Sequence, residues 1–166
     1  MLYAVGEGIA PVNLMALPTS GDGKPIRIVS EPIQHAQFSP DGRWIAYSSA
    51  KSGRLEVYVV AFPTGTPQGQ VSNNGGEQPR WAGRAGELIY LAPNGKLMAV
   101  PVKMGATFDA GTPTPLFNIR TNLVNQRHQY AVSTNGQRFL VSALVGDVAS
   151  QSSMTVVFNW PALLKK

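Results

Sequence analysis

The chain has 166 residues, enough for one domain with a substantial hydrophobic core. Hydrophobic residues make up 43% of it and charged residues only 14%, a balance that excludes an intrinsically disordered chain. The 17 glycines and 13 prolines exclude long helices and coiled coils, and they favour short strands joined by tight turns.

The distribution of charge, the length of the apolar runs and the lack of cysteine exclude several kinds of partner and site. The net charge is +5, but the basic residues are scattered along the chain, so we do not expect a nucleic-acid site. No apolar run approaches the roughly 18 residues of a membrane span, and residues 1–5 do not resemble the start of a signal peptide. The absence of cysteine excludes disulfides, thiolate metal sites and cysteine nucleophiles.

Three short strands are expected first, at 2–5, 13–17 and 26–29, separated by turn-forming residues. A repeat then begins, with three copies at 38–47, 81–90 and 132–141. Each copy has an apolar anchor (Phe38, Trp81 or Val132), then a turn, then a run rich in strand-forming residues. The anchors lie about 40–50 residues apart, which is the period of propeller blades.

Further strands are expected between the anchors, at 55–61, 68–72, 97–103, 116–119 and 154–159. Each repeat therefore holds about four antiparallel strands. We predict an all-β fold, a β-propeller fragment of three to four four-stranded blades. We divide it into a partial blade at 1–30, blades at 31–73 and 74–120, and a last blade at 121–166.

The repeat resembles a known family. One segment reads Phe38-Ser39-Pro40-Asp41-Gly42 and is followed by the strand-forming run at 45–49. It is similar to the repeat of TolB-type, WD-like six-bladed β-propellers. Residues 129–141, 155–160 and 163–166 resemble the end of the sensor region of bacterial eukaryotic-type Ser/Thr kinases. This resemblance implies an extracytoplasmic sensor region in a parent protein. The kinase motifs are missing from the sequence, so we do not expect kinase activity.

Residues that precede the inner strand of each blade converge beside the central channel of a propeller. Four residues before the anchors stand Gln34, Glu77 and His128, and three before them stand His35, Gln78 and Gln129. Imidazole and carboxylate groups suit a divalent metal. We predict His35, Glu77 and His128 as ligands of a metal, with zinc favoured over calcium or manganese. We predict Gln34, Gln78, Arg80 and Gln129 as ligand-binding residues at the channel mouth.

Three functions remain open. The first is a binding or scaffold module whose channel accepts a small-molecule ligand or a partner. The second is a metal-dependent hydrolase acting on a lactone, ester or phosphotriester, and the third is an inactive sensor remnant. Polar residues at a propeller mouth are also common simply because water fills the channel. We further expect a homodimer that closes one ring of six to eight blades, because half a ring would leave two blade faces bare.

Overall fold

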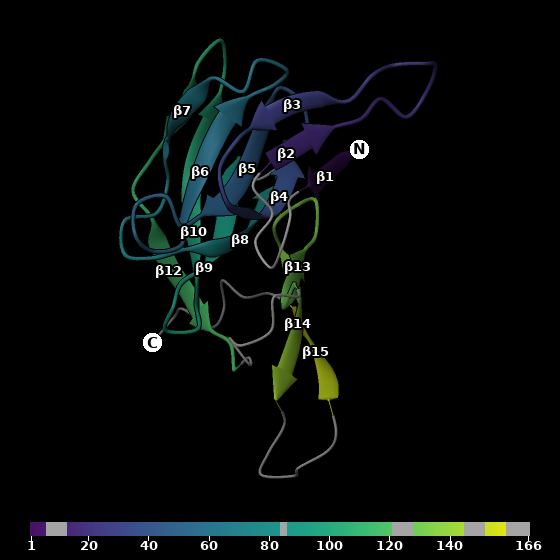
Figure 1. Cartoon of the computed structure of the whole chain (residues 1–166). Helices are drawn as coiled ribbons and strands as arrows, with labels where there is room; N and C mark the ends of the chain where they lie inside the picture. The colour runs from purple at the N-terminus through teal and green to yellow at the C-terminus, as the bar shows by residue number, and fades with distance from the viewer. Residues whose placement is uncertain (6–12, 84–85, 121–127, 145–151, 159–166) are drawn as a thin grey trace.

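A computed structural model describes residues 1–5, 13–83, 86–120, 128–144 and 152–158. Its strands form four antiparallel sheets that follow one another in chain order (Figure 1). Within these ranges there is no α-helix, and so none long and apolar enough to cross a membrane. The prediction of an all-β chain built from antiparallel sheets is confirmed.

The first sheet contains β1 (Leu2–Val5), β2 (Asn13–Ala16) and β3 (Ile26–Val29). The second contains β4 (Ile33–Phe38), β5 (Trp44–Ser49), β6 (Glu56–Ala61) and β7 (Pro67–Gln70). The third contains β8 (Glu77–Ala82), β9 (Glu87–Leu91), β10 (Lys96–Met104) and β12 (Thr114–Asn118), and β11 (Phe108–Ala110) pairs with the end of β10. The fourth contains β13 (Tyr130–Val132), β14 (Arg138–Leu144) and β15 (Ser152–Phe158). The boundaries predicted between the blades stay a prediction.

A hydrogen-bonded turn joins the first two strands of the second sheet. The Ser39 hydroxyl donates to the Asp41 carboxylate at 2.6 Å and accepts a bond from the backbone N–H of Trp44 at 2.9 Å. Gly42 has a φ of 71°, a left-handed conformation that glycine adopts without strain. These bonds fix where β5 begins, and therefore its register with β4.

The fourth sheet repeats this turn with different residues. The Ser133 hydroxyl donates to Asn135 at 2.7 Å and accepts from the backbone N–H of Arg138 at 3.0 Å. Gly136 has a φ of 72°. Two copies of the sequence repeat thus form the same local structure, because an Asx side chain and a following glycine meet the same turn geometry.

In the part of the chain that the structure describes, the core consists of three apolar clusters, and each joins two neighbouring sheets. Between the second and third sheets, Trp44 and Trp81 are buried and both pack against Phe108, with ring centroids 5.8 and 6.2 Å away. Between the third and fourth sheets, Phe139 is fully buried and its ring lies 5.2 Å from that of Phe117. Face-to-face packing of successive sheets is the arrangement of propeller blades.

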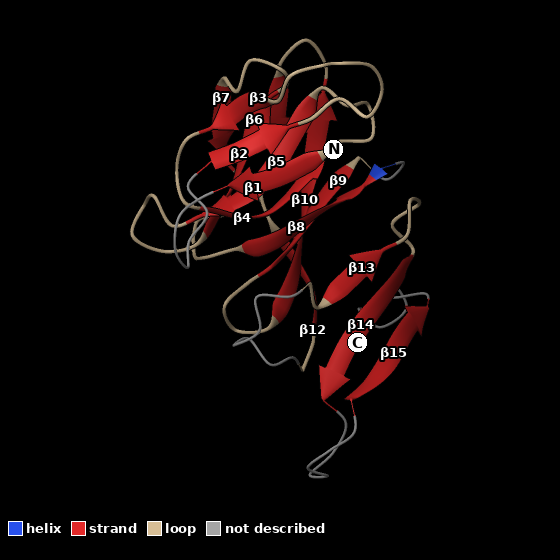
Figure 2. Cartoon of the chain, turned by 45° about the vertical axis from the view of Figure 1, so that its right-hand side comes forward, coloured by secondary structure: helices blue, strands red, loops and turns tan. Residues whose placement is uncertain are grey.

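The first strands of three successive sheets lie beside one another. Strand β4 contacts β8, and β8 contacts β13. Figure 2 shows these three strands in succession through the middle of the molecule. Side chains of β4, β8 and the residues just before β13 are thereby brought to one region.

Candidate functional site

Two of the three first strands carry the same distortion. The pairing of β4 with β5 shifts register between Gln34 and Gln37, and the pairing of β8 with β9 shifts between Glu77 and Arg80. Within each shift one residue has a left-handed backbone, His35 with a φ of 54° and Gln78 with a φ of 55°. These two residues occupy the same position in their repeats. A left-handed conformation costs a non-glycine residue about 1–2 kcal/mol. Bulges of this kind redirect side chains at the edges of sites.

The two histidines of the chain meet at this place. The ring of His35 in β4 lies 4.9 Å, centroid to centroid, from the ring of His128, with the ring planes tilted by 59°. His128 stands two residues before β13, so the two histidines come from the second sheet and from the segment that leads into the fourth. The third sheet lies between them in chain order. Their contact shows that the first strands converge here.

Arg80 of β8 supplies the third member of the cluster. Its positive charge acts on the imidazole of His128 and on the hydroxyl of Tyr130. Arg80 is partly buried, and this burial lowers the pKa of its guanidinium. Gln37 holds the equivalent position in the preceding repeat, and its side chain reaches the backbone N–H of Trp81 in the next sheet. We call His35, Arg80 and His128 the mouth cluster; its members come from the second sheet, the third sheet and the segment that leads into the fourth.

Gln78 forms hydrogen bonds with residues of the two neighbouring sheets. Its side chain is 1% exposed, and its Oε1 accepts a 2.7 Å hydrogen bond from the backbone N–H of Gln129. Its own backbone N–H donates to the Ser48 hydroxyl at 3.2 Å, and its carbonyl accepts from the Tyr130 hydroxyl at 2.7 Å. Gln78 therefore links the second, third and fourth sheets. Its amide Nε2 is buried and has no hydrogen-bond partner among the residues that the structure describes.

The Tyr130 hydroxyl is a functional group that the sequence reasoning missed. It is buried, and its one O–H is shared between the carbonyls of Gln78 at 2.7 Å and Ile89 at 3.0 Å. Burial raises the pKa of Tyr130, so this hydroxyl remains protonated. A tyrosine next to the predicted mouth residue Gln129 was the available signal, because a buried Tyr hydroxyl usually finds a hydrogen-bond partner.

Among the other predicted mouth residues, Gln129 is buried next to His128, and Gln34 pairs with Ser48 across β4 and β5. The charge of Glu77 also acts on the Tyr130 hydroxyl, and it raises the pKa of that group. Glu77 lines a pocket of about 290 Å³ together with Arg54, Gly75, Gly76, Leu91 and Pro93. Burial raises the pKa of its carboxyl. In the part of the chain that the structure describes, no three His, Asp or Glu side chains are grouped closely enough to hold a metal ion. The metal-ligand assignment of His35, Glu77 and His128 stays a prediction.

The charge state of His128 gives a testable consequence of this geometry. Partial burial, and then the charges of Arg80 and His35, lower the pKa of His128 from 6.5 to about 4. The unfolded chain takes up this proton near pH 6.5. The stability that neutral His128 contributes is therefore present above pH 6.5 and is lost as the pH falls toward 4. We expect the His128 ring resonances, followed by NMR, to titrate near pH 4, and the Arg80→Gln variant to titrate at a higher pH. A wild-type midpoint of 6.5 or above would contradict the expected burial and charge effects.

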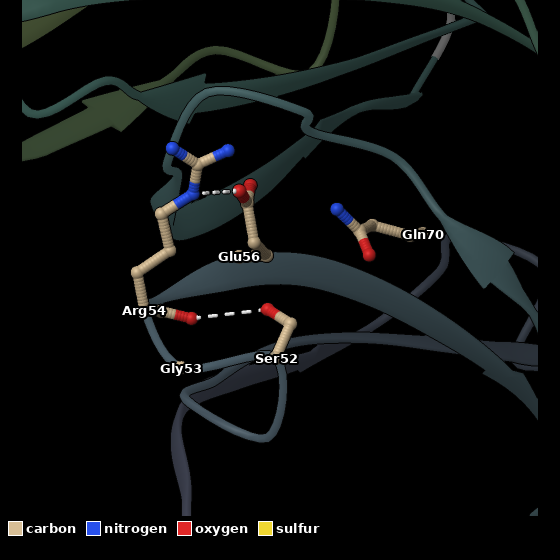
Figure 3. A pocket seen from close by; sticks show the side chains of 5 residues that line it. All are labelled: Ser52, Gly53, Arg54, Glu56 and Gln70. Atoms are coloured by element: carbon tan, nitrogen blue, oxygen red, sulfur yellow. Dashed lines mark hydrogen bonds and ion pairs between the residues drawn. The ribbon is translucent and has the colours of Figure 1, made fainter.

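A second hollow lies on the second sheet (Figure 3). It has a volume of about 420 Å³ and is lined by Ser52, Gly53, Arg54, Glu56 and Gln70. Its buried carboxylate, Glu56, accepts bonds from Arg54 Nε at 2.7 Å, from the backbone N–H of Gly75 at 2.9 Å, and from the Ser72 hydroxyl. Because the Glu56 carboxylate already accepts hydrogen bonds from groups of this chain, this network stabilises the segment leading into β8 and does not indicate a ligand site.

The sheet topology and the inter-sheet packing define a β-propeller fold. Among solved structures, the chain is similar to the β-propeller domain of Cps50 (Swd1) from Myceliophteria thermophila. The TM-score is 0.59 at 14% sequence identity, over 95% of this chain and 52% of that one. The chain thus spans about half the length of that propeller, and the likeness shows the fold alone. No family model and no curated protein matches the chain. The resemblance to TolB-type propellers and to kinase sensor regions stays a prediction.

Proposed function

We propose that this chain is a ligand-binding scaffold module whose binding surface is the channel mouth formed by β4, β8 and β13. The observation that supports this proposal is the contact of His35 with His128, whose ring centroids lie 4.9 Å apart, together with the charge of Arg80 acting on His128. Left-handed backbone at His35 and Gln78 supports it, because strained backbone tends to be retained where side-chain placement matters.

A fragment screen followed by backbone amide NMR tests this proposal. We expect chemical-shift changes to concentrate at residues 34–35, 78–80 and 128–130, which belong to three sheets. The structure offers an internal comparison, a pocket of about 520 Å³ lined in part by Asn73, Tyr90, Pro93 and Met98. Fragments that bind only at this comparison pocket would overturn the assignment of the mouth.

The His35–His128 pair favours a second candidate, a divalent metal at the same mouth serving a hydrolase. Two imidazoles 4.9 Å apart are potential zinc ligands. Zinc titration of untagged protein, with His128→Ala as the variant, tests the metal. If a hydrolase is present, chelation should remove activity toward lactones, esters or phosphotriesters. Absence of saturable zinc binding in the wild type would remove this candidate.

We also expect the chain to self-associate and close a ring with a second copy. Among the described residues, the large hydrophobic side chains that are exposed are Met1, Ile26 and Leu140; Ile26 lies on the first sheet, Leu140 on the last, and Met1 directly precedes β1. Within the described residues each of these sheets packs against one neighbouring sheet, so a second copy could cover its other face. Sedimentation at micromolar concentration should give about twice 17.8 kDa, and a double variant, Ile26→Glu with Leu140→Glu, should dissociate. A folded wild-type monomer under these conditions would contradict the expectation.

A further inference from the structure

The pocket of about 290 Å³ that Glu77 lines is built by loops of the second and third sheets. Glu77 is the first residue of β8, and it pairs with Leu91, the last residue of β9. Residues 54–55 lead into β6, residues 75–76 lead into β8, and Pro93 follows β9. Three loops therefore enclose a space that has an acidic residue in its wall. We call this space the Glu77 pocket.

Glu77 is partly buried, and its carboxylate forms no ion pair and no hydrogen bond with another described residue. Glu31, Asp41 and Glu56 each pair with a lysine or an arginine. The Tyr130 hydroxyl, on which the charge of Glu77 acts, already donates to two carbonyls and supplies no positive charge. Burial raises the pKa of the Glu77 carboxyl. A cation from outside the chain would offset the cost of burying this charge.

Besides Glu77, the charged residue that lines the pocket is Arg54. Its Nε donates to the Glu56 carboxylate at 2.7 Å, and a terminal nitrogen donates to the Asn73 carbonyl. The charge of Arg54 is therefore balanced by Glu56. Lys96 lines the adjoining pocket of about 520 Å³ and not this one. The negative charge of Glu77 is thus the charge that remains for a ligand.

Backbone contacts fix the walls of the Glu77 pocket. The N–H of Gly75 donates to the Glu56 carboxylate at 2.9 Å, and the N–H of Gly76 donates to the Leu55 carbonyl at 2.9 Å. Gly75 has a φ of 88°, and a Cβ at this position would lie 2.4 Å from Cγ of Pro93. The loop before β8 therefore packs directly on the loop after β9. A pocket that exists before the ligand arrives spares the cost of ordering its walls.

The lining and the size of the pocket indicate which cation fits. Divalent metals take several oxygen, nitrogen or sulfur ligands, and no group of three His, Asp or Glu side chains occurs among the described residues. An alkylammonium ion needs one carboxylate for its N–H donors, and its carbon chain suits apolar residues such as Leu55 and Pro93. A volume of about 290 Å³ lies at the lower end for ligand pockets, which favours a small molecule.

We propose that the Glu77 pocket binds a small alkylammonium compound, with its ammonium group on the Glu77 carboxylate and its carbon chain against Leu55 and Pro93. None of the mouth-cluster residues lines this pocket, so the inference does not rest on the proposed function.

NMR titration of the full chain, followed at the backbone amides, tests this inference. The probes are n-butylammonium, n-butanol and a blocked Gly-Lys-Gly peptide, all at one ionic strength held with sodium chloride. We expect saturable shift changes at residues 55 and 75–77 with n-butylammonium, and none with n-butanol. Equal binding of n-butanol would show that charge plays no part and would overturn the proposal. A lysine peptide that binds at least tenfold more tightly than n-butylammonium would rule out a small molecule as the ligand.

The matched variants are Glu77→Gln and Glu87→Gln, which remove the same charge at nearly the same volume. Glu87 is also partly buried, and burial raises the pKa of its carboxyl too, but it begins β9, whereas Leu91 ends that strand. Glu77→Gln should weaken n-butylammonium binding at least tenfold, and Glu87→Gln should leave it unchanged. Undiminished binding in Glu77→Gln, or equal loss in both variants, would contradict the assignment. Fragments at the mouth shift residues 34–35 and 128–130 instead, so this inference and the proposed function can fail separately.

Discussion

Replacing Phe139 by alanine is expected to lower the free energy of unfolding by about 3–5 kcal/mol, the range measured for fully buried aromatic side chains. Phe139 is 0% exposed and lies in the cluster that joins the third and fourth sheets, beside Leu116 and Ile119. The variant removes a ring from between two sheets, where rigid strands on both sides limit collapse of the cavity. Urea denaturation followed by circular dichroism measures the change.

The matched control for this variant is Ser142→Ala. Ser142 lies on the same strand, β14, and is exposed. Its replacement should change the free energy of unfolding by less than about 0.5 kcal/mol, as is usual for surface positions. A loss below about 1 kcal/mol for Phe139→Ala would show that the fourth sheet does not depend on this packing.

The second large effect is expected at Glu56. Its side chain is 1% exposed, and its carboxylate accepts bonds from Arg54, Ser72 and the backbone of Gly75. Glu56→Gln keeps the volume but places an amide N–H₂ where one of these donors points. It also leaves Arg54 without its anion. We expect a loss of about 3 kcal/mol, because breaking a buried charged network leaves its remaining groups unsatisfied.

Glu31→Gln serves as the comparison for Glu56. Glu31 also forms an ion pair, with Lys51 at 3.1 Å, but the two side chains are 22% and 34% exposed. A more solvent-exposed pair contributes about 0–1 kcal/mol. Thermal unfolding of both variants should therefore show a clearly larger drop in the midpoint for Glu56→Gln. Equal drops would mean that the Glu56 network does not stabilise the segment leading into β8.

Much of the fold was predictable because turns and strands are local. The residue types of Asp41-Gly42 and Asn135-Gly136 predict turns, and the strands that follow these turns begin at the expected places. Strand β11 was not predicted. It is three residues long and pairs with the extended end of β10, so its formation depends on the partner strand and not on its own pattern.

The candidate site was predictable only in part, for a physical reason. Counting back from the anchors predicted that His35 and His128 lie near each other, and their ring centroids are 4.9 Å apart because the first strands of successive sheets converge. The same count placed Glu77 with them; Glu77 lines a pocket with Arg54 and Leu91, and its place in a shared metal site stays a prediction. A bulge between Glu77 and Arg80 interrupts the alternation of side chains along β8, so distance from an anchor no longer decides where a side chain lies. Register shifts depend on pairing between strands, which a single sequence pattern does not encode.

The contact between His35 and His128 has a consequence for how the molecule unfolds. Each apolar cluster links only adjacent sheets, so the chain behaves like a row of units in which stability passes from neighbour to neighbour. The contact between the two histidines joins the second sheet directly to the segment before the fourth, without passing through the third sheet. A ligand bound at the mouth would stabilise two interfaces at once, the one between the second and third sheets and the one between the third and fourth. Partly unfolded states in which one terminal sheet detaches would then become rarer, and amide protons of β13 would exchange more slowly with solvent whenever the mouth is filled.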